Sequence, residues 1–340
     1  MAEVQTYRGP IEATGLGVTL IHEHVFVRDR ELAANYPDPE WQEAEAVERA
    51  VAAFTALHAL GVRTIVDLTV PGLGRDPSLV ASVAARVPVH IIAATGWYTP
   101  DSLPLYFRFH GPGRLIDRPD PLVDYFVRDI AEGIAGTSVR AGMLKVMSDD
   151  RGISPDAARV MAAAAEAHEQ TGIPITTHSV PASRNGLEQQ AFLRERSVDP
   201  SRIIIGHSGD SEDVDYLRTL MDGGSTIGMD RFGMEHVLPD DRRATTVLAL
   251  LRLGYADRMI LSHDAAIYSH VTPPSWRGSH APHWHMADIH RRVIPMLRAG
   301  GASDRELEQM LVLNPRRLLG PASGDAAGVG GDGPAVESLG

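Results

Sequence analysis

The sequence predicts a single-domain α/β protein that folds as a closed (β/α)8 barrel, a TIM barrel. Eight short apolar segments, several of them rich in β-branched residues, recur along the 340-residue chain, and helical patterns lie between most of them. Eight strands that alternate with helices over about 310 residues favour a closed parallel barrel over an open sheet. The expected strands are residues 18–21, 64–68, 90–94, 142–146, 173–177, 203–205, 226–229 and 259–261.

Signals at the ends of the expected helices support this alternation. Residues 44–60 carry their apolar side chains on one side of a helical pattern that stops at Gly61. Residues 154–172 begin with Ser-Pro, a common helix start, and end at a glycine. Ser303 and Glu306 have the spacing of a capping box ahead of a further helix.

The barrel pattern accounts for almost the whole chain. We interpret residues 1–320 as one domain, because neither a linker nor an internal repeat interrupts them. Residues 321–340 are rich in Gly, Ala, Asp and Ser, and we expect them to form a flexible C-terminal tail.

Composition narrows the class of protein. Cysteine is absent, which excludes disulfides and thiolate metal sites and leaves histidine and carboxylates as metal ligands. The formal net charge of -12 and the lack of a Lys/Arg stripe disfavour nucleic acid as a partner. No run of about 18 apolar residues occurs, and the start has no basic flank ahead of an apolar stretch. We therefore expect no membrane partner and a soluble, cytoplasmic protein.

Residues that can bind metal follow several of the predicted strands. In a parallel barrel the carboxyl ends of the strands converge on one mouth, where catalytic sites lie. Nitrogen and oxygen ligands of this kind suit zinc or a similar divalent ion. The sequence therefore predicts a metal site at the C-terminal mouth, built from His22, His24, Lys145, His178, His207 and Asp264.

The His22 and His24 pair is the local signal for this site. Side chains two apart in a strand point to the same side, so both imidazoles can reach one ion while Glu23 points away. Taken alone, the pair fits equally well two histidines that are hydrogen-bonded at a strand end. Asp264 ends the eighth strand, which adjoins the first in a closed barrel, and so can face the pair.

Lys145 is the unusual member of the set, because an ammonium group has no lone pair to offer a cation. Apolar neighbours and nearby positive charge would lower its pKa, and the neutral amine could then react with carbon dioxide. The carbamate is a carboxylate on a long stem that can bridge two metals. Two alternatives remain open, a salt bridge to Asp149 or Asp150 and a Schiff-base lysine in a metal-free barrel.

A family resemblance now becomes specific. The motifs GVTLIHEH, ATGWY, GMLKVM, ITTH, IIIGHSGD, GMDRFG and ILSHDA occur in this order between about Arg8 and Leu319. Together they resemble the phosphotriesterase family of the amidohydrolase superfamily, and most closely its phosphotriesterase-like lactonases. The resemblance implies a (β/α)8 barrel with a binuclear metal site.

The resemblance also implies roles for individual residues. The HxH pair and Asp264 would hold the more buried ion, His178 and His207 the more exposed one, and a CO2-derived carbamate on Lys145 would bridge them. Zinc is the expected metal, with cobalt, manganese or iron as alternatives. Tyr98 and Arg231 match residues that line the lactonase pocket. Phosphotriesterases proper usually have histidine at the latter position, so the arginine favours the lactonase branch.

A hydrolytic mechanism follows for such a site. A water shared by two cations loses its proton near neutral pH and would attack the lactone carbonyl. Tyr98 would help to stabilise the oxyanion, and Asp264 would take the proton and return it to the leaving alkoxide. Asp210 and Arg231 would extend this proton route. The alternatives are packing at the mouth for Tyr98, and for Arg231 a salt bridge to Asp230 or Asp210.

We expect a small lactone or ester as substrate, including N-acyl homoserine lactones of the kind degraded in quorum quenching, with promiscuous organophosphate triesterase activity. Phosphotriester or N-acyl amide hydrolysis as the main activity, and a metal-free Schiff-base enzyme using Lys145, are the alternatives. A homodimer is what the resemblance implies. Long loops would form apolar pocket walls, or else cover the barrel end or contact a second subunit, through Tyr268, Trp276 and Trp284 and through Phe232, Met234 and Val237.

Overall fold

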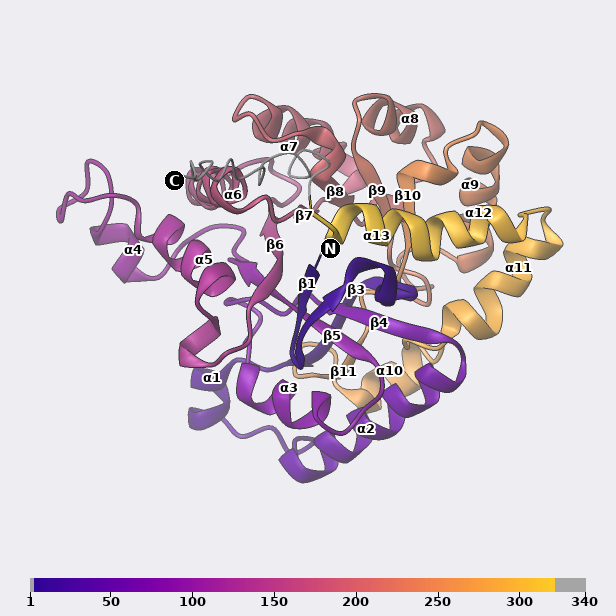
Figure 1. The fold of residues 1–340 in the computed structure, drawn as a ribbon, viewed down its shortest axis with the longest axis horizontal. Coiled ribbons are helices and arrows are strands. Elements are labelled where there is room, and N and C mark those ends of the chain that lie inside the picture. The colour runs from indigo at the N-terminus through magenta and orange to yellow at the C-terminus, as the bar shows by residue number, and fades with distance from the viewer. Residues whose placement is uncertain (1–2, 322–340) are drawn as a thin grey trace, which may run out of the picture.

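The computed structural model describes residues 3–321 and confirms the predicted barrel (Figure 1). Its main sheet has nine strands, and every neighbouring pair in it runs parallel. The strands are β3 (Val18–Val27), β4 (Val62–Asp67), β5 (His90–Gly96), β6 (Ala141–Met147), β7 (Ile175–His178), β8 (Ile203–Gly206), β9 (Thr226–Met229), β10 (Met259–Leu261) and β11 (Ala266–Ser269).

The predicted eighth strand, residues 259–261, is β10, and an unpredicted second piece, β11, completes the eighth strand position and closes the barrel. β10 pairs with β9, whereas β11 pairs with β3 on the other side. Between them the Asp264 N–H donates to the His22 carbonyl at 3.0 Å, and the His24 N–H donates to the Ala265 carbonyl at 2.9 Å. Because consecutive pieces of chain hold the two ends of the strand order, the sheet closes on itself.

Helices surround the strands, as expected for this fold (Figure 1). The predicted helix caps are confirmed: the Ser154 side chain accepts from the Ala157 N–H, and Ser303 and Glu306 form a capping box. Two π-helical turns, Ile289–Val293 and Gln309–Leu313, precede the last turns of their helices. The α-helices are α1 (Arg30–Asn35), α2 (Glu43–Ala59), α3 (Pro77–Ala84), α4 (Leu105–Phe109), α5 (Pro121–Ala131), α6 (Pro155–Thr171), α7 (Gly186–Arg194), α8 (Val214–Asp222), α9 (Asp240–Arg252), α10 (Pro274–His280), α11 (Ile294–Ala299), α12 (Asp304–Glu308) and α13 (Asn314–Leu319).

Besides β11, the sequence did not predict the N-terminal hairpin of β1 (Glu3–Thr6) and β2 (Gly9–Glu12). Its Val4 belongs to the apolar cluster inside the barrel, together with Leu318 and Leu319 of α13. β1 accordingly lies beside α13 in Figure 1. Both chain ends of the barrel domain therefore help to fill the barrel interior.

A second apolar cluster, far larger, packs the outward faces of the strands against the helices. In β6 the two clusters alternate, since Met143 faces the interior while Leu144 and Val146 face the helices. Lys145 therefore points inward, toward the open end of the barrel. The predicted tail, residues 321–340, lies outside the described residues except for Pro321. Within residues 3–321, no helix has both the length and the apolar character needed to cross a bilayer.

Candidate metal centre

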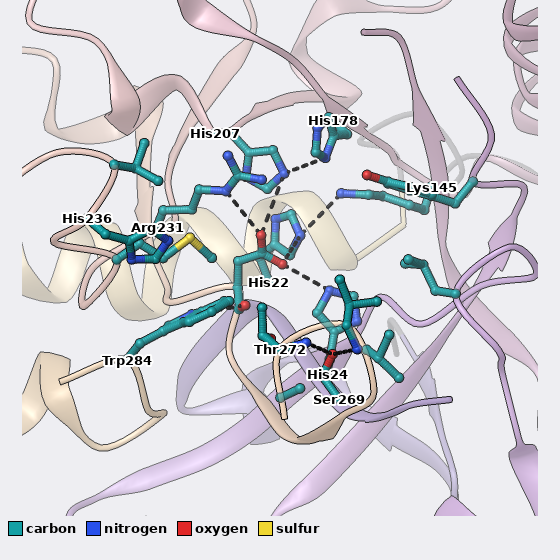
Figure 2. A pocket seen from close by; sticks show the side chains of 18 residues that line it. His22, His24, Lys145, His178, His207, Arg231, His236, Ser269, Thr272 and Trp284 are labelled. Carbon is teal, nitrogen blue, oxygen red and sulfur yellow. Dashed lines mark hydrogen bonds and ion pairs between the residues drawn. The ribbon is translucent and has the colours of Figure 1, made fainter. Parts of the chain in front are cut away.

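All the residues predicted as metal ligands meet in one cavity of about 330 Å³ at the carboxyl ends of the strands (Figure 2). A strand irregularity helps to place His22. The pairing of β3 with β4 shifts register between Leu20 and Glu23, so that Ile21 belongs to the interior cluster and His22 still lines the cavity. The cavity is lined by His22, His24, Val27, Leu73, Tyr98, Lys145, His178, His207, Arg231, Met234, His236, Val237, Asp264, Ala266, Ser269, Val271, Thr272 and Trp284.

His22, His24 and Asp264 form a group that can hold a metal ion. Asp264 Oδ1 lies 3.0 Å from His24 Nε2 and 3.4 Å from His22 Nε2. Asp264 has a φ of 52°, in the left-handed region that a non-glycine residue rarely adopts. This strained backbone turns the carboxylate toward the two imidazoles.

The second predicted pair is also adjacent. His207 Nε2 lies 2.9 Å from His178 Nδ1, and the His207 ring stands 4.8 Å from that of His22. Lys145, only 1% exposed, places its Nζ 3.2 Å from His22 Nε2. The expected alternative of a Lys145–Asp149 salt bridge is wrong, because Asp149 binds Arg151 on the rim.

Asp230 is a residue of the site that the sequence did not predict. It is fully buried, with Oδ2 2.7 Å from His22 Nδ1 and Oδ1 3.2 Å from His207 Nδ1. By engaging both Nδ1 atoms it leaves both Nε2 atoms facing the cavity, the usual role of a carboxylate behind metal-binding histidines. The available signal was its position directly after the seventh strand.

His24 is oriented in a similar way by a second buried set. Its Nδ1 lies 2.9 Å from the Thr69 hydroxyl, which donates to the Asp67 carboxylate at 2.6 Å. Asp67 is the last residue of β4, the strand next to β3, and Thr69 follows that strand. Each histidine of strand β3 thus has its Nδ1 engaged by a residue that follows another strand, Thr69 after β4 for His24 and Asp230 after β9 for His22.

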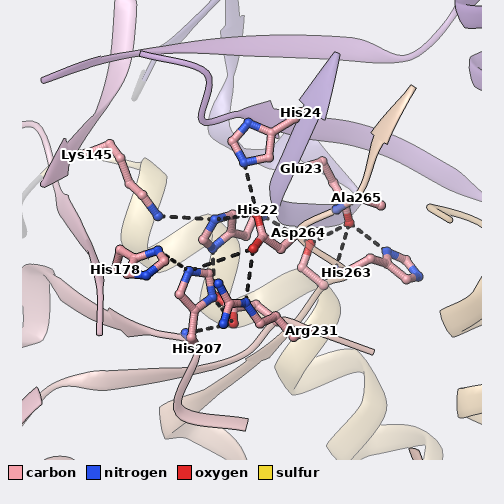
Figure 3. Close-up of polar contacts among 12 residues, drawn as sticks. His22, Glu23, His24, Lys145, His178, His207, Arg231, His263, Asp264 and Ala265 are labelled. Carbon is pink, nitrogen blue, oxygen red and sulfur yellow. Dashed lines mark hydrogen bonds and ion pairs between the residues drawn. The ribbon is translucent and has the colours of Figure 1, made fainter. Parts of the chain in front are cut away.

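Glu23 points away from the cavity, as predicted, and holds the broken eighth strand to β3 (Figure 3). Its carboxylate accepts from the Ser262 hydroxyl at 2.7 Å and from the Ala265 N–H at 3.1 Å. The His263 side chain lies against it as well, with Nδ1 2.6 Å from Oε1. His263 is therefore a satisfied structural histidine, as expected, and Glu23 fixes the turn that carries Asp264.

The electrostatics of the cavity keep His178, His207 and Asp264 in forms that can bind cations. Burial lowers the pKa of Lys145 to about 8 and that of His207 to about 4. Burial and the neighbouring His207 hold the pKa of His178 well below its usual range. Burial acts in the opposite direction on Asp264, yet His22 and His207 outweigh it and keep the pKa of this carboxyl well below its usual range. At neutral pH, His178 and His207 are therefore neutral and Asp264 is ionised.

The arrangement fits divalent cations. Neutral imidazole nitrogens 2.9 Å apart, such as those of His178 and His207, repel through their lone pairs unless a proton or a cation lies between them. Histidine nitrogens and a carboxylate are the ligands that zinc and related ions prefer. Lys145 is the one member whose amine needs chemical change to join them.

Arg231 and Asp210 meet in a salt bridge, the contact that the sequence offered as the alternative to a catalytic role for Arg231. Arg231 Nη1 donates to Asp210 Oδ2 at 2.8 Å, and its Nε donates to Asp264 Oδ2 at 3.1 Å. The alternative partner Asp230 is excluded, because it is occupied by the two histidines. Tyr98 lines the cavity with its ring 5.4 Å from that of His178, and burial followed by the charge of Asp264 raises its pKa, so its phenol stays protonated.

The pocket walls differ in part from the prediction. Trp284, Met234 and Val237 line the cavity as expected. Tyr268 does not, because it lies on β11, where it is buried against Trp41 and bonded to Asp38. Phe232 is buried in the core, and Trp276 stacks on His280 outside the lining.

Comparison with known proteins decides the family. The model of the phosphotriesterase family matches residues 2–319. The chain belongs to the phosphotriesterase family. This family member is 47% identical over 319 residues to the phosphotriesterase homology protein of Mycobacterium tuberculosis, with 94% of this chain and 98% of that protein covered.

Two further likenesses bear on this phosphotriesterase-family chain. It is 38% identical over 311 residues to an aryldialkylphosphatase of Saccharolobus solfataricus, with 91% of this chain and 96% of that protein covered. Its fold matches the structure of the phosphotriesterase from Mycobacterium tuberculosis with a TM-score of 0.91 and 47% identity, over 93% of this chain and 98% of the other. The chain is therefore a hydrolase that acts on ester bonds.

Proposed function

We propose that this phosphotriesterase-family hydrolase opens lactones, including N-acyl homoserine lactones, and hydrolyses organophosphate triesters more weakly. The observation that carries the proposal is Arg231, paired with Asp264 beneath a largely apolar pocket wall. Its long, charged side chain replaces the histidine usual in phosphotriesterases proper. An apolar wall of Val27, Leu73, Met234, Val237, Val271 and Trp284 suits an acyl chain.

The residues that would hold two divalent cations are His22, His24, His178, His207 and Asp264, with Lys145 as a bridging carbamate. Bound there, the cations would acidify water and polarise the substrate carbonyl or phosphoryl oxygen. The choice of zinc, cobalt, manganese or iron would follow availability, since the ligands accept each of them.

The chain's own residues would supply orientation and proton transfer. The Tyr98 phenol would donate a hydrogen bond to the developing oxyanion. Asp264, ionised at neutral pH, would accept a proton from the attacking water and return it to the leaving alkoxide. Arg231 would hold Oδ2 of that carboxylate in place, and Asp210 would hold Arg231.

Phosphotriester hydrolysis is the second candidate for the main activity. It is favoured by the likeness to the aryldialkylphosphatase, and both reactions place negative charge on an oxygen at the same site. The test compares kcat/KM on a long-chain acyl lactone, an aryl dialkyl phosphate and an N-acyl amino compound. The proposal expects the lactone to rank first, and a preference for either of the others would overturn it.

We also propose a homodimer. Five large apolar side chains lie exposed in residues 105–116, a segment that projects beyond the barrel around α4 (Figure 1). An exposed apolar patch of this kind is typical of a protein contact. A second copy of this chain would cover it, by contact of the same patch on both subunits.

A further inference from the structure

One wall of the pocket is a segment without regular secondary structure, residues 231–239, between β9 and α9. It supplies Arg231, Met234, His236 and Val237 to the lining. A side chain at the start of α9 holds this segment. That side chain is Arg243, which is 1% exposed and one of the largest fully buried side chains in residues 3–321.

The Arg243 guanidinium joins the segment to the catalytic network. Its Nη1 donates to the Leu238 carbonyl and, at 3.3 Å, to the Met234 carbonyl. These two carbonyls flank the wall residues His236 and Val237. Its Nη2 donates to Asp210. A planar guanidinium can make these bonds at once, whereas a single ammonium group cannot.

From Arg243 the contacts lead to the reacting carboxylate through charges of alternating sign. Arg243 binds Asp210, Asp210 binds Arg231 at 2.8 Å, and Arg231 binds Asp264 at 3.1 Å. On the other side Arg243 lies 3.7 Å from Asp240, which accepts the Gly233 N–H at 2.9 Å. Each buried charge stands between opposite charges, so moving one member leaves its neighbour unpaired.

We propose that Arg243 is a positioning residue that sets both the orientation of the Arg231–Asp264 pair and the shape of the substrate wall at residues 233–239. One buried side chain thereby couples turnover to substrate selectivity. The inference deepens the proposed function and rests on it, because it takes the substrate to lie against this wall.

The test uses two variants, Arg243→Met and Arg243→Lys, and a matched control. Arg159 on α6 is built in the same way, since it donates to the carbonyls of Phe107 and His110 and binds Asp120. The segment it holds lines no part of the pocket. Arg159→Met therefore measures the general cost of losing a half-buried arginine that fastens a loop.

Three quantities are measured on the metal-loaded proteins: hydrogen exchange of residues 233–239, metal content, and kcat and KM over a series of acyl-chain lengths. In Arg243→Met we expect faster exchange of this segment, unchanged metal content, and kcat lower on the order of tenfold to a hundredfold. Selectivity between long and short chains should fall as well. Arg159→Met should leave all of these at their wild-type values.

Arg243→Lys separates the two roles. Its ammonium can keep the ion pair with Asp210 but not both carbonyl bonds. We expect kcat to recover most of the way while the loss of chain-length selectivity in KM persists.

Wild-type exchange of residues 233–239 in Arg243→Met would overturn the proposal, and so would equal effects in Arg159→Met. If Arg243→Met does not fold, parallel recovery of kcat and selectivity in Arg243→Lys would contradict it. Failure of the proposed lactonase function would show separately as wild-type protein without lactone turnover. Exchange of the segment still tests the role of Arg243 in that case, because it needs no substrate.

Discussion

The Asp230 carboxylate determines which nitrogen of two histidines faces the cavity. It contacts Nδ1 of both His22 and His207, so each Nε2 is directed at the position where a cation would bind. An amide in its place can accept from only one of the two rings and must offer a donor to the other. The second histidine would then carry its proton on the nitrogen that should bind metal.

Asp230→Asn should therefore lower metal affinity by about 10–100-fold. A competition titration with a chromogenic chelator measures it. Asp129→Asn is the matched control, because Asp129 is a buried carboxylate that pairs with Arg75, and neither residue lines the cavity. Equal metal affinity in both variants would mean that Asp230 does not orient the ligands.

Lys145 gives a prediction about pH. Burial lowers its pKa to about 8, so the amine is charged below that pH and neutral above it, and only the neutral amine reacts with carbon dioxide. The rate at which metal-depleted protein regains activity in metal and bicarbonate should rise between roughly pH 7 and 9. His178 and His207 add no pH dependence there, because both are already neutral.

Lys145→Arg is the control for this experiment, since a guanidinium stays charged throughout the range and should regain nothing. A reactivation rate in the wild-type protein that does not change with pH would argue against the carbamate.

At this scale the sequence predicted the residues that meet in the cavity better than the residues that hold them in place. His22, His178 and Asp264 stand out because ligand types recur after apolar strands, a local pattern. Asp230 contacts His22 and Thr69 contacts His24, and each pair is far apart in the sequence. In the sequence alone, Asp230 beside Arg231 suggests a surface ion pair. Only the closed barrel brings such residues together.

At the scale of elements, irregular strands place the site. β3 shifts register ahead of His22, the eighth strand breaks at Asp264, and β5 ends at Gly96 against β6. A Cβ at Gly96 would stand 2.0 Å from the Lys145 carbonyl oxygen, and the glycine has a φ of 127°. Glycine is therefore required where β5 passes the strand that carries the lysine.

Gly96→Ala should lower the free energy of unfolding by more than the cost of placing alanine at a positive φ. Because the added Cβ would displace the strand that carries Lys145, it should also weaken metal binding. Gly61→Ala isolates that cost, since Gly61 also has a positive φ of 102° but its added Cβ meets nothing within 4 Å. We expect about 1–2 kcal/mol for Gly61→Ala from backbone strain, and a further 1–3 kcal/mol, roughly, for Gly96→Ala from crowding. Urea denaturation measures both, and equal losses would contradict the close approach.

Strand positions were predictable because buried parallel strands are continuous apolar runs, as in β6 and β8. The break between β10 and β11 was not predictable, because it depends on Glu23 binding Ser262 and Ala265 where the barrel closes. The β1–β2 hairpin was missed for a similar reason. Its strands have four residues each, and it is held by packing Val4 into the barrel end.

At the scale of the molecule, the exposed apolar segment 105–116 makes a prediction about assembly. Leu105 is 65% exposed and Leu115 82% exposed, beside Tyr106 and Phe109. A stable dimer buries about 800 Å² per partner, and in the proposed dimer this patch would supply the apolar centre. The wild-type protein should behave as a dimer in light scattering, and the double variant Leu105→Asp, Phe109→Asp as a monomer.

Leu253→Asp is the control for the assembly experiment. Leu253 is 52% exposed but lies after α9, away from this segment. A dimer that persists in the double variant, or dissociates equally in the control, would place the contact elsewhere.

We infer that the cavity at the barrel mouth holds two cations on which ester hydrolysis depends. The most direct measurement determines metal content and lactone turnover together, on protein as purified, after chelation, and after refilling with zinc, cobalt, manganese or iron. We expect about two ions per chain, and we expect turnover to be lost when they are removed and restored when they are replaced. Turnover that persists in metal-free protein would contradict it and direct attention to Lys145 as a covalent catalyst.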